Sequence, residues 1–405
     1  MSTNFLDKFK KHSLYSIIRC IPKLFLILKM YTIKNKRVFK TCMLARRNLL
    51  NLHDTQLLKL IGHTDWIKAL CFSQSGNLLA TGSWDKKIII YSLSPLDEHF
   101  GKEIIKLSCH TNYVNCLYFS QCENFLASAS KDMTSIISHI NMKQRETLGK
   151  EYLKLLGHNN DITSICYSPC SNYIATGSCD RTVLIYGVNR FNRETFGHIL
   201  TKLTGHIDSI LTIAYSPDGN YIASGGKDCN TIIHKINKSD LLHILDLQHK
   251  PELNQSQDIT DGNTHERYIL GEHTNTIHSV NFSNCGGYFA TGSADRTAII
   301  YGANPNLKLN FCKPILKIVN QHKDWVLSIA FSSNVKYFAT GGADKKAIIY
   351  RFNVLESLYY QDCIIATDKV LSHENHKDRI FSVAFSPCSN YFATASDDKS
   401  VIVYC

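Results

Sequence analysis

Histidine, a hydroxyl residue and aspartate recur together in this chain, and these three side chains are also the parts of a hydrolytic triad. In the stretch from Gly157 to Tyr186 they are His158, Thr176 and Asp180, so the hydroxyl and the carboxylate follow the histidine by 18 and 22 residues. In a hydrolase, the histidine would take a proton from the hydroxyl while the aspartate orients the imidazole. The same spacing occurs seven times, in the sets His63, Thr81, Asp85; His110, Ser128, Asp132; His158, Thr176, Asp180; His206, Ser224, Asp228; His273, Thr291, Asp295; His322, Thr340, Asp344; and His376, Thr394, Asp398.

Seven equivalent sets favour structure over catalysis. A catalytic site needs one exposed constellation, whereas a motif repeated at fixed spacing is typical of a repeated structural unit. The sequence also lacks a Gly-rich phosphate loop, a cluster with metal-ligand spacing and a singular pair of carboxylates. We therefore expect a structural hydrogen-bonding network, no metal or cofactor, no small-molecule substrate and no enzymatic activity. A hydrolase that uses the centre of the fold is the minority alternative.

Short apolar runs around each set indicate the elements that position it. One run follows the histidine (DITSICY), a second follows a turn (NYIATG), a third follows the aspartate (TVLIY), and a fourth precedes the next histidine (ILTKLTGH). Each unit is thus predicted to be four antiparallel strands joined mainly by tight turns. Because nearly every strand position is apolar, both faces of each small sheet should be covered by neighbours. The sequence therefore predicts all-β sheets stacked around a ring.

The spacing between successive histidines places the length variation of the repeats. The intervals are 47, 48, 48, 67, 49 and 54 residues, while the spacing inside each unit is constant. The extra residues must therefore fall between the third and fourth strands. The largest excess, residues 241–266, is polar and turn-rich in its second half, which predicts an exposed loop rather than a further domain.

With these spacings the repeats resemble the WD-repeat family of β-propellers, whose units begin with Gly-His and end with Trp-Asp. Gly62-His63, Gly157-His158 and Gly205-His206 keep the first signature, whereas the last position is tyrosine in five units and Ser138 or His234 in the other two. The resemblance covers residues 57–405. It implies a seven-bladed propeller over residues 55–405, in which the histidine, hydroxyl and aspartate network fixes the turns of one rim. The tyrosine at the fourth position is a doubtful member of that network.

The end of the chain predicts how such a ring closes. The last unit stops at its third strand, VIVYC, and therefore lacks a fourth. The stretch TQLLKLI, residues 55–61, precedes the first histidine and has no earlier unit to join. We expect it to pair with Ser400–Cys405, which would remove an open sheet edge.

The formal charge of +11 belongs to an N-terminal extension. Residues 1–50 hold 12 Lys and Arg against Asp7 alone, and the rest of the chain is balanced. Residues 1–52 are predicted to be a basic, amphipathic extension that is too interrupted by charge to span a membrane. Three alternatives stay open for this extension, namely a solvated tail, contact with an anionic membrane and contact with nucleic acid.

The cysteines indicate a reducing compartment. There are 15, an odd number scattered through the units, and several, such as Cys71 and Cys166, occupy apolar strand positions. Free thiols are expected, and we predict a cytoplasmic protein, with organelle, nuclear or membrane-surface targeting by residues 1–52 left open.

Family resemblance places partner binding on the rim turns, and two positions in each unit can be examined there. One lies three residues after the histidine and the other immediately before the aspartate, and together they contain all three tryptophans. Trp and Arg dominate many binding interfaces. Because a closed ring makes units 6, 7, 1 and 2 consecutive, we predict a partner-binding sector made of Trp66, Trp84, Tyr113, Lys131, Trp325 and Arg379. The alternative is that these rings only pack over neighbouring turns.

The expected function is a non-enzymatic scaffold or adaptor that binds protein or peptide partners and helps to assemble a multiprotein complex. In the alternative, the adaptor is also tethered to a membrane surface or to nucleic acid through residues 1–52.

Overall fold

The computed structural model describes residues 56–405 except 96, 142–143, 145, 190, 193–194, 237–265, 306–309 and 356–363. The chain divides into two units, residues 1–53 and residues 54–405, and all described residues belong to the second. The extension predicted for residues 1–52 lies outside the described residues. So does the loop predicted for residues 241–266, apart from Glu266.

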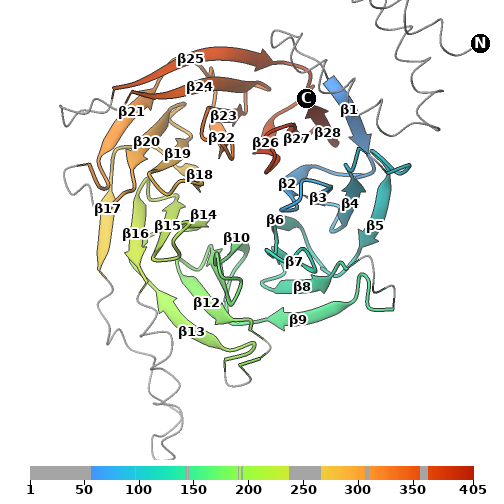
Figure 1. The fold of residues 1–405 in the computed structure, drawn as a ribbon. Coiled ribbons are helices and arrows are strands. Elements are labelled where there is room, and N and C mark those ends of the chain that lie inside the picture. The colour runs from blue at the N-terminus through green and yellow to red at the C-terminus, as the bar shows by residue number, and fades with distance from the viewer. Residues whose placement is uncertain are drawn as a thin grey trace, which may run out of the picture. The chain divides into compact units, whose positions relative to one another are not determined.

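The described residues form seven four-stranded antiparallel sheets arranged around a ring (Figure 1). We number these blades 1 to 7 in the order of the histidines that precede them. Blades 1 to 4 comprise β2 (Ile67–Phe72), β3 (Leu78–Ser83), β4 (Ile88–Ser92) and β5 (Glu103–Leu107); β6 (Val114–Phe119), β7 (Phe125–Ser130), β8 (Ser135–His139) and β9 (Glu151–Leu155); β10 (Ile162–Tyr167), β11 (Tyr173–Ser178), β12 (Val183–Gly187) and β13 (Ile199–Leu203); β14 (Ile210–Tyr215), β15 (Tyr221–Gly226), β16 (Thr231–Lys235) and β17 (Arg267–Leu270). Blades 5 to 7 comprise β18 (Ile277–Phe282), β19 (Tyr288–Ser293), β20 (Ala298–Gly302) and β21 (Pro314–Ile318); β22 (Val326–Phe331), β23 (Tyr337–Gly342), β24 (Ala347–Leu355) and β25 (Ile364–His373); β26 (Ile380–Phe385), β27 (Phe392–Ser396), β28 (Ser400–Tyr404) and β1 (Gln56–Ile61).

This architecture confirms the predicted all-β, seven-bladed propeller. The first strand of each unit lies nearest the axis and the last lies outermost (Figure 1). Four of the third strands, β4, β12, β20 and β28, are buried along their whole length, because neighbouring blades cover both of their faces. The hydrophobic clusters accordingly lie between blades, and one of them joins Ile185 of blade 3 to Ile210 and Ile222 of blade 4.

Strand β1 supplies the fourth strand of blade 7 from the other end of the described chain. It pairs antiparallel with β28, from Gln56 opposite Tyr404 to Ile61 opposite Ser400. Leu60 is buried in a cluster that contains Tyr91 of blade 1 and Val401 of blade 7. The two ends of the ring are therefore joined by both hydrogen bonds and apolar packing, and β28 has no free edge.

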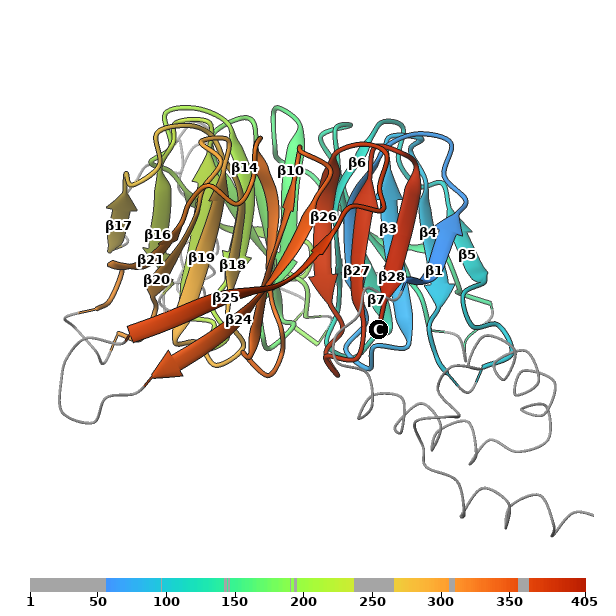
Figure 2. The same ribbon diagram turned by 90° about the horizontal axis from the view of Figure 1, so that it is seen from above.

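Blade 6 departs from the regular repeat. Strands β24 and β25 are longer than their equivalents, and they stay paired as far as Leu355 opposite Ile364. Figure 2 shows this hairpin crossing the side of the ring obliquely and reaching beyond the neighbouring strands. The sequence predicts only a longer connection at this point. It does not distinguish an extended pair of strands from a loop, because both add the same number of residues.

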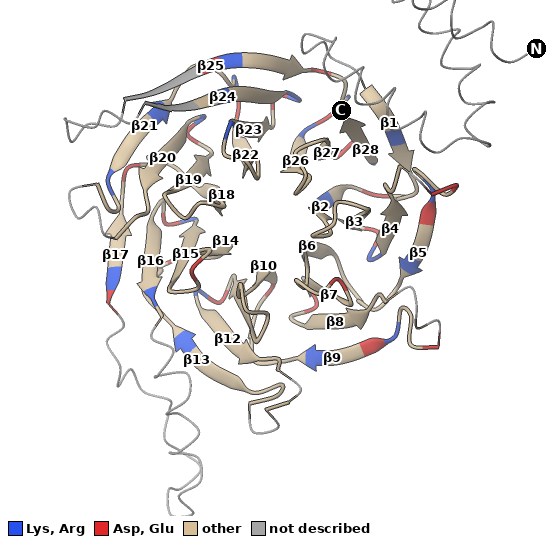
Figure 3. Ribbon diagram, in the orientation of Figure 1, with Lys and Arg blue, Asp and Glu red and all other residues tan. Residues whose placement is uncertain are grey.

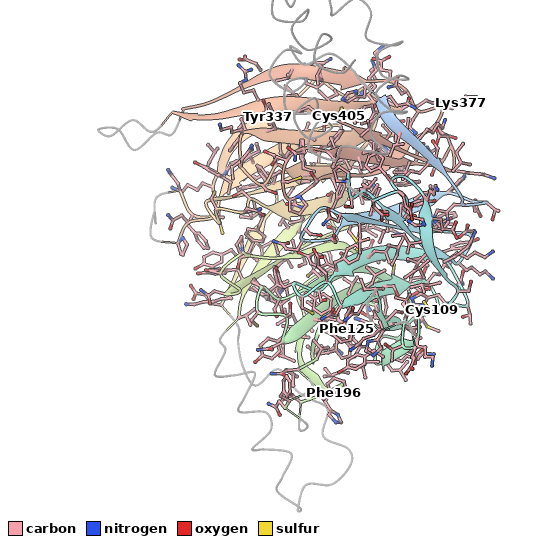
Figure 4. The ribbon with its side chains drawn as sticks, turned by 45° about the vertical axis from the view of Figure 1, so that its right-hand side comes forward. Cys109, Phe125, Phe196, Tyr337, Lys377 and Cys405 are labelled. Carbon is pink, nitrogen blue, oxygen red and sulfur yellow. The ribbon has the colours of Figure 1, made fainter. Side chains whose placement is uncertain are left out.

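The ring has two rims, and only one carries the seven histidines of the repeated sets. The histidine rim consists of the connections that enter each innermost strand and the turns between the second and third strands. Lys377 and Cys109 mark it in Figure 4, whereas Tyr337, Phe125, Phe196 and Cys405 lie toward the opposite rim. The described cysteines are free thiols. Within the described part of the chain, no helix is long and apolar enough to cross a membrane.

Candidate functional site

All seven predicted histidine sets are assembled on the histidine rim. In each, the imidazole Nδ1 lies 2.7–2.9 Å from the aspartate carboxylate, and Nε2 lies 2.7–2.9 Å from the hydroxyl oxygen. The histidine belongs to the connection between blades, the hydroxyl to the second strand and the aspartate to the following turn. One imidazole therefore holds three separate segments together.

The aspartate extends this network into the backbone. In blade 1, the Asp85 carboxylate accepts hydrogen bonds from the backbone N–H of Thr64 at 3.0 Å and of Lys87 at 2.9 Å. Burial raises the pKa of Asp85, but the bonds from His63 and these backbone groups more than offset that effect and lower the pKa to about 2. The carboxylate is therefore ionised at neutral pH and fixes both the entry connection and the turn.

Two further positions complete the rim turns, and the sequence analysis did not identify them. An Asp or Asn two residues after each histidine accepts a hydrogen bond from the backbone N–H of the next residue, as Asp65 does from Trp66 at 2.8 Å. In five blades a serine 20 residues after the histidine links the two turns, as Ser83 does by donating to the carbonyl of Asp65. The recurrence of Asp or Asn in all seven units was the available signal. These bonds orient the residue at the first candidate binding position.

An aromatic cluster joins blades 7, 1 and 2 on this rim. The ring centroids of Trp66 and Trp84 lie 4.5 Å apart, and Trp84 stacks on Tyr113 at 4.5 Å with an interplanar angle of 3°. Phe381 of β26 extends the cluster, with its centroid 6.5 Å from that of Trp66. All four rings are partly exposed. The structure thus brings together three predicted residues and adds Phe381, which lies on an inner strand rather than in a turn.

The other predicted rim residues lie around this cluster. Lys131 lies with its ammonium group 5.5 Å from the Tyr113 ring and 3.8 Å from the Asp161 carboxylate. Trp325 is 43% exposed and stacks on His278 of blade 5, with centroids 5.6 Å apart. The Trp325 ring therefore takes part in a second aromatic contact, whereas Arg379 is exposed and its charge acts on Asp397.

Phe381 belongs to a set of seven equivalent side chains near the axis of the ring. Each stands five residues after a network histidine, on the innermost strand, and we call the set the axial ring: Lys68, Asn115, Thr163, Leu211, His278, Leu327 and Phe381. The Lys68 ammonium lies 4.4 Å from the Phe381 centroid and 5.9 Å from that of Trp84. Burial lowers the pKa of Lys68, although the charge of Asp397 opposes this. Burial and the charges of Lys68 and Lys227 lower the pKa of His278 to about 4.

Asp397 is the unusual carboxylate of the rim. It occupies in blade 7 the position that Trp84 occupies in blade 1, it is 5% exposed, and its Oδ1 has no hydrogen-bond partner among the described residues. Burial and the neighbouring Asp378 raise the pKa of Asp397 to about 7, against the opposing charges of Arg379 and Lys68. Perturbed groups of this kind gather at functional sites.

Comparison with known proteins matches the repeats seven times. The family described as WD domain, G-beta repeat covers residues 54–92, 101–137, 149–187, 197–235, 265–302, 313–351 and 368–405, more than half of the chain. This chain belongs to the WD-repeat family. A search of curated proteins found no match. WD-repeat propellers are generally non-enzymatic and typically act as protein-interaction scaffolds.

The burial of the histidine sets in this WD-repeat propeller indicates that their role is structural. The seven network hydroxyl residues are 0% exposed. A substrate cannot reach them, and Thr81 in addition donates to the carbonyl of Ile89 at 3.2 Å. Among the described residues there is also no group of three or more His, Cys, Asp or Glu arranged to hold a metal ion. The arrangement can position rim turns, but it does not present a nucleophile.

The tyrosine at the last position of blade 3 interacts with the neighbouring blade. In blade 3, the Tyr186 hydroxyl donates a hydrogen bond to the carbonyl of Leu156, at 3.2 Å, just after β9 of the preceding blade. Burial raises the pKa of Tyr186 to about 12, so the hydroxyl keeps its proton. This tyrosine therefore ties neighbouring blades together.

Proposed function

We propose that this WD-repeat propeller is a non-enzymatic scaffold that captures protein or peptide partners on its histidine rim. The observation that carries the proposal is the partly exposed aromatic cluster of Trp66, Trp84, Tyr113 and Phe381. Large aromatic rings contribute apolar area together with a polar edge, and they dominate many interfaces.

The rest of the ring argues that the cluster is not needed for folding. At the same two positions, blades 4 and 5 carry Ser209 with Lys227, and Thr276 with Ala294. Those blades form the same four strands and the same histidine network. Since the fold accepts small and polar residues there, packing over neighbouring turns does not by itself account for two tryptophans in contact.

Trp325 and Arg379 extend the proposed surface toward blade 6. Trp325 is the most exposed of the three tryptophans. The Asp324 carboxylate accepts a hydrogen bond from the backbone N–H of Trp325 at 2.8 Å. Its ring is thus held on a rigid turn, which lowers the conformational entropy lost on binding. Lys131 closes the other end of the surface beside Tyr113.

Affinity capture with the full chain tests the proposal. The double variant Trp66→Ala with Trp325→Ala should lose the partners that the unchanged protein captures, while circular dichroism and thermal unfolding show an intact ring. Ile207→Ala is the matched control, because Ile207 is 78% exposed on the same rim but belongs to blade 4. Unchanged capture by the double variant would overturn the proposal. Contact with a membrane or nucleic acid through residues 1–52 stays a separate prediction.

A further inference from the structure

Positive charge on the histidine rim is concentrated on blades 6, 7 and 1. Figure 3 shows the charged residues distributed over the turns and the outer strands. On the histidine rim of these three blades, eight basic side chains have no ion-pair partner among the described residues, and we call them the cationic arc: Lys68, Lys86, Lys87, Lys323, Lys345, Lys377, Arg379 and Lys399. Lys68 of the arc contacts Trp84 and Phe381, Lys86 and Lys87 follow Trp84 in the same turn, and Lys323 directly precedes Asp324.

Most acidic side chains of the same blades have a partner within the protein, and Asp397, whose Oδ1 has none among the described residues, is the exception. Asp65, Asp324 and Asp378 each accept a hydrogen bond from the backbone N–H of the next residue. Glu374 binds Lys346, and the network aspartates bind histidines. Blades 3 to 5 differ, because their rim turns carry similar numbers of basic and acidic residues, namely Arg181, Lys227 and Arg296 with Asp161, Asp208 and Glu272.

Lys68 places one charge of the arc at the axis, inside the aromatic cluster. Its ammonium faces Phe381 and Trp84, and no carboxylate of the described residues lies within ion-pair distance of it. Desolvation by the rings makes an unpaired ammonium costly. The nearby Asp397 does not relieve this cost by a direct contact, although each residue feels the charge of the other. A carboxylate supplied from outside would give Lys68 its missing partner.

We infer that the segment captured on this rim is an acidic peptide, which places one carboxylate against the Lys68 ammonium and an apolar side chain against Trp66 and Phe381. This inference rests on the proposed function, whose surface it shares. A nucleic acid is less favoured because Asp324 and Asp378 lie directly beside Lys323, Lys377 and Arg379 in the sequence, and Asp65 lies three residues before Lys68. A continuous phosphate backbone would have to pass these carboxylates, whereas separate acidic side chains can be placed between them.

Binding of a carboxylate beside Asp397 should be coupled to a proton. The charged groups that face Asp397 are Lys68 from β2, Asp378 and Arg379 from the connection before β26, and Asp398 from its own turn. A ligand carboxylate adds a further negative charge, so the complex favours protonated Asp397. Its pKa of about 7 makes this uptake measurable, and affinity should fall about tenfold between about pH 6 and about pH 8.

Selection from a random peptide library displayed on phage, with the full chain as bait, tests the inference. Selected peptides should be enriched in Asp and Glu over the starting library. A synthetic selected peptide should bind Lys68→Gln, or the exposed charge reversal Lys86→Glu with Lys399→Glu, about tenfold more weakly. Lys227→Gln on blade 4 is the matched control and should bind normally. Asp397→Asn should bind with the pH dependence removed.

The other outcomes separate this inference from the proposed function. Peptides that require Trp66 but show no acidic enrichment would overturn the inference and leave the proposed surface standing. If the library yields no peptide that needs Trp66, the inference also fails, and affinity capture then decides the function. If a single-stranded oligonucleotide displaces the selected peptides and binds more tightly in a Lys68-dependent way, the arc is a nucleic-acid site and the acidic-peptide assignment is wrong.

Discussion

Replacing Asp397 by asparagine should stabilise the protein, although it removes a charged group from a well-formed turn. The Asp397 side chain is 5% exposed and its Oδ1 has no hydrogen-bond partner among the described residues. Its pKa is raised to about 7, so folding at neutral pH must bury a carboxylate that would be fully solvated in the unfolded chain. An asparagine side chain has nearly the same shape as aspartate but carries no charge.

The magnitude follows from the pKa and from what asparagine leaves unsatisfied. Raising the pKa from 3.8 to about 7 corresponds to at most about 4 kcal/mol of folding free energy. The asparagine amide, buried without partners, has a desolvation cost of its own of about 1–3 kcal/mol, which reduces this gain. The net gain expected for Asp397→Asn is therefore about 1–3 kcal/mol above about pH 7. Because the folded pKa is raised, the cost of Asp397 is absent below the unfolded pKa near 4 and grows as pH rises to about 7.

Thermal unfolding of both proteins from about pH 4 to about pH 8 measures this difference. The two should unfold at temperatures that diverge as pH rises toward about 7 and then stay parallel. Asp161→Asn is the control, since it removes a carboxylate from the same rim that already has a lysine partner. A difference that does not change with pH, or a variant that is less stable at about pH 8, would refute the reasoning about Asp397.

Four further predictions follow from the network, the turns and the N-terminal extension. Asp180→Ala leaves His158 without its carboxylate and should cost about 3 kcal/mol in denaturant unfolding, whereas Trp325→Ala should cost less than about 1 kcal/mol; equal costs would contradict the structural role of the network. The pKa of Asp85 is lowered to about 2, so its contribution to stability is complete above the unfolded pKa near 4 and disappears as pH falls through about 2, which acid titration of the fold by circular dichroism measures. Arg181 has a φ of 73°, and Arg181→Gly should stabilise the turn by up to about 1 kcal/mol while Arg181→Ala does not, as paired thermal melts would show. Deleting residues 1–52 should abolish flotation with anionic liposomes if that extension contacts membranes, and equal flotation of both proteins would exclude such contact.

Much of the fold is predictable here because the determinants are local and repeated. The residues equivalent to His158, Thr176 and Asp180 meet in every unit. The constant spacing between them leaves one arrangement of strands and turns. Seven copies turn a weak pattern into a strong one. The longer hairpin of β24 and β25 is different, because its extra length occurs once and no repeat constrains how those residues pair.

The candidate site is predictable only in part. The spacing places Trp66, Trp84 and Tyr113 on one rim, but not the stacking of Trp84 on Tyr113, which depends on the distance between blades. Lys68 and Phe381 each follow an isoleucine in a mainly apolar strand. Their local sequence therefore suggests ordinary core positions and does not indicate that the two side chains meet. Their meeting depends on closure of the ring, which brings together strands more than 300 residues apart in the chain.

Trp325 shows the same limit in another way. Its position three residues after His322 predicts a place in the sector around Trp66. In the structure its ring stacks on His278 of the preceding blade 5, just as the Trp66 ring contacts Phe381 of the preceding blade 7. Both tryptophans therefore contact the innermost strand of the preceding blade, which the spacing of the repeats alone does not predict.

The central claim, that partners bind on the histidine rim around Trp66, is tested most directly by the hydrogen-exchange footprint of a captured partner on the full chain. We predict slower amide exchange in residues 64–68, 84–87, 377–381 and 397–399, with the turns of the opposite rim unchanged. Protection confined to the opposite rim, to the outer strands or to residues 1–52 would contradict the account.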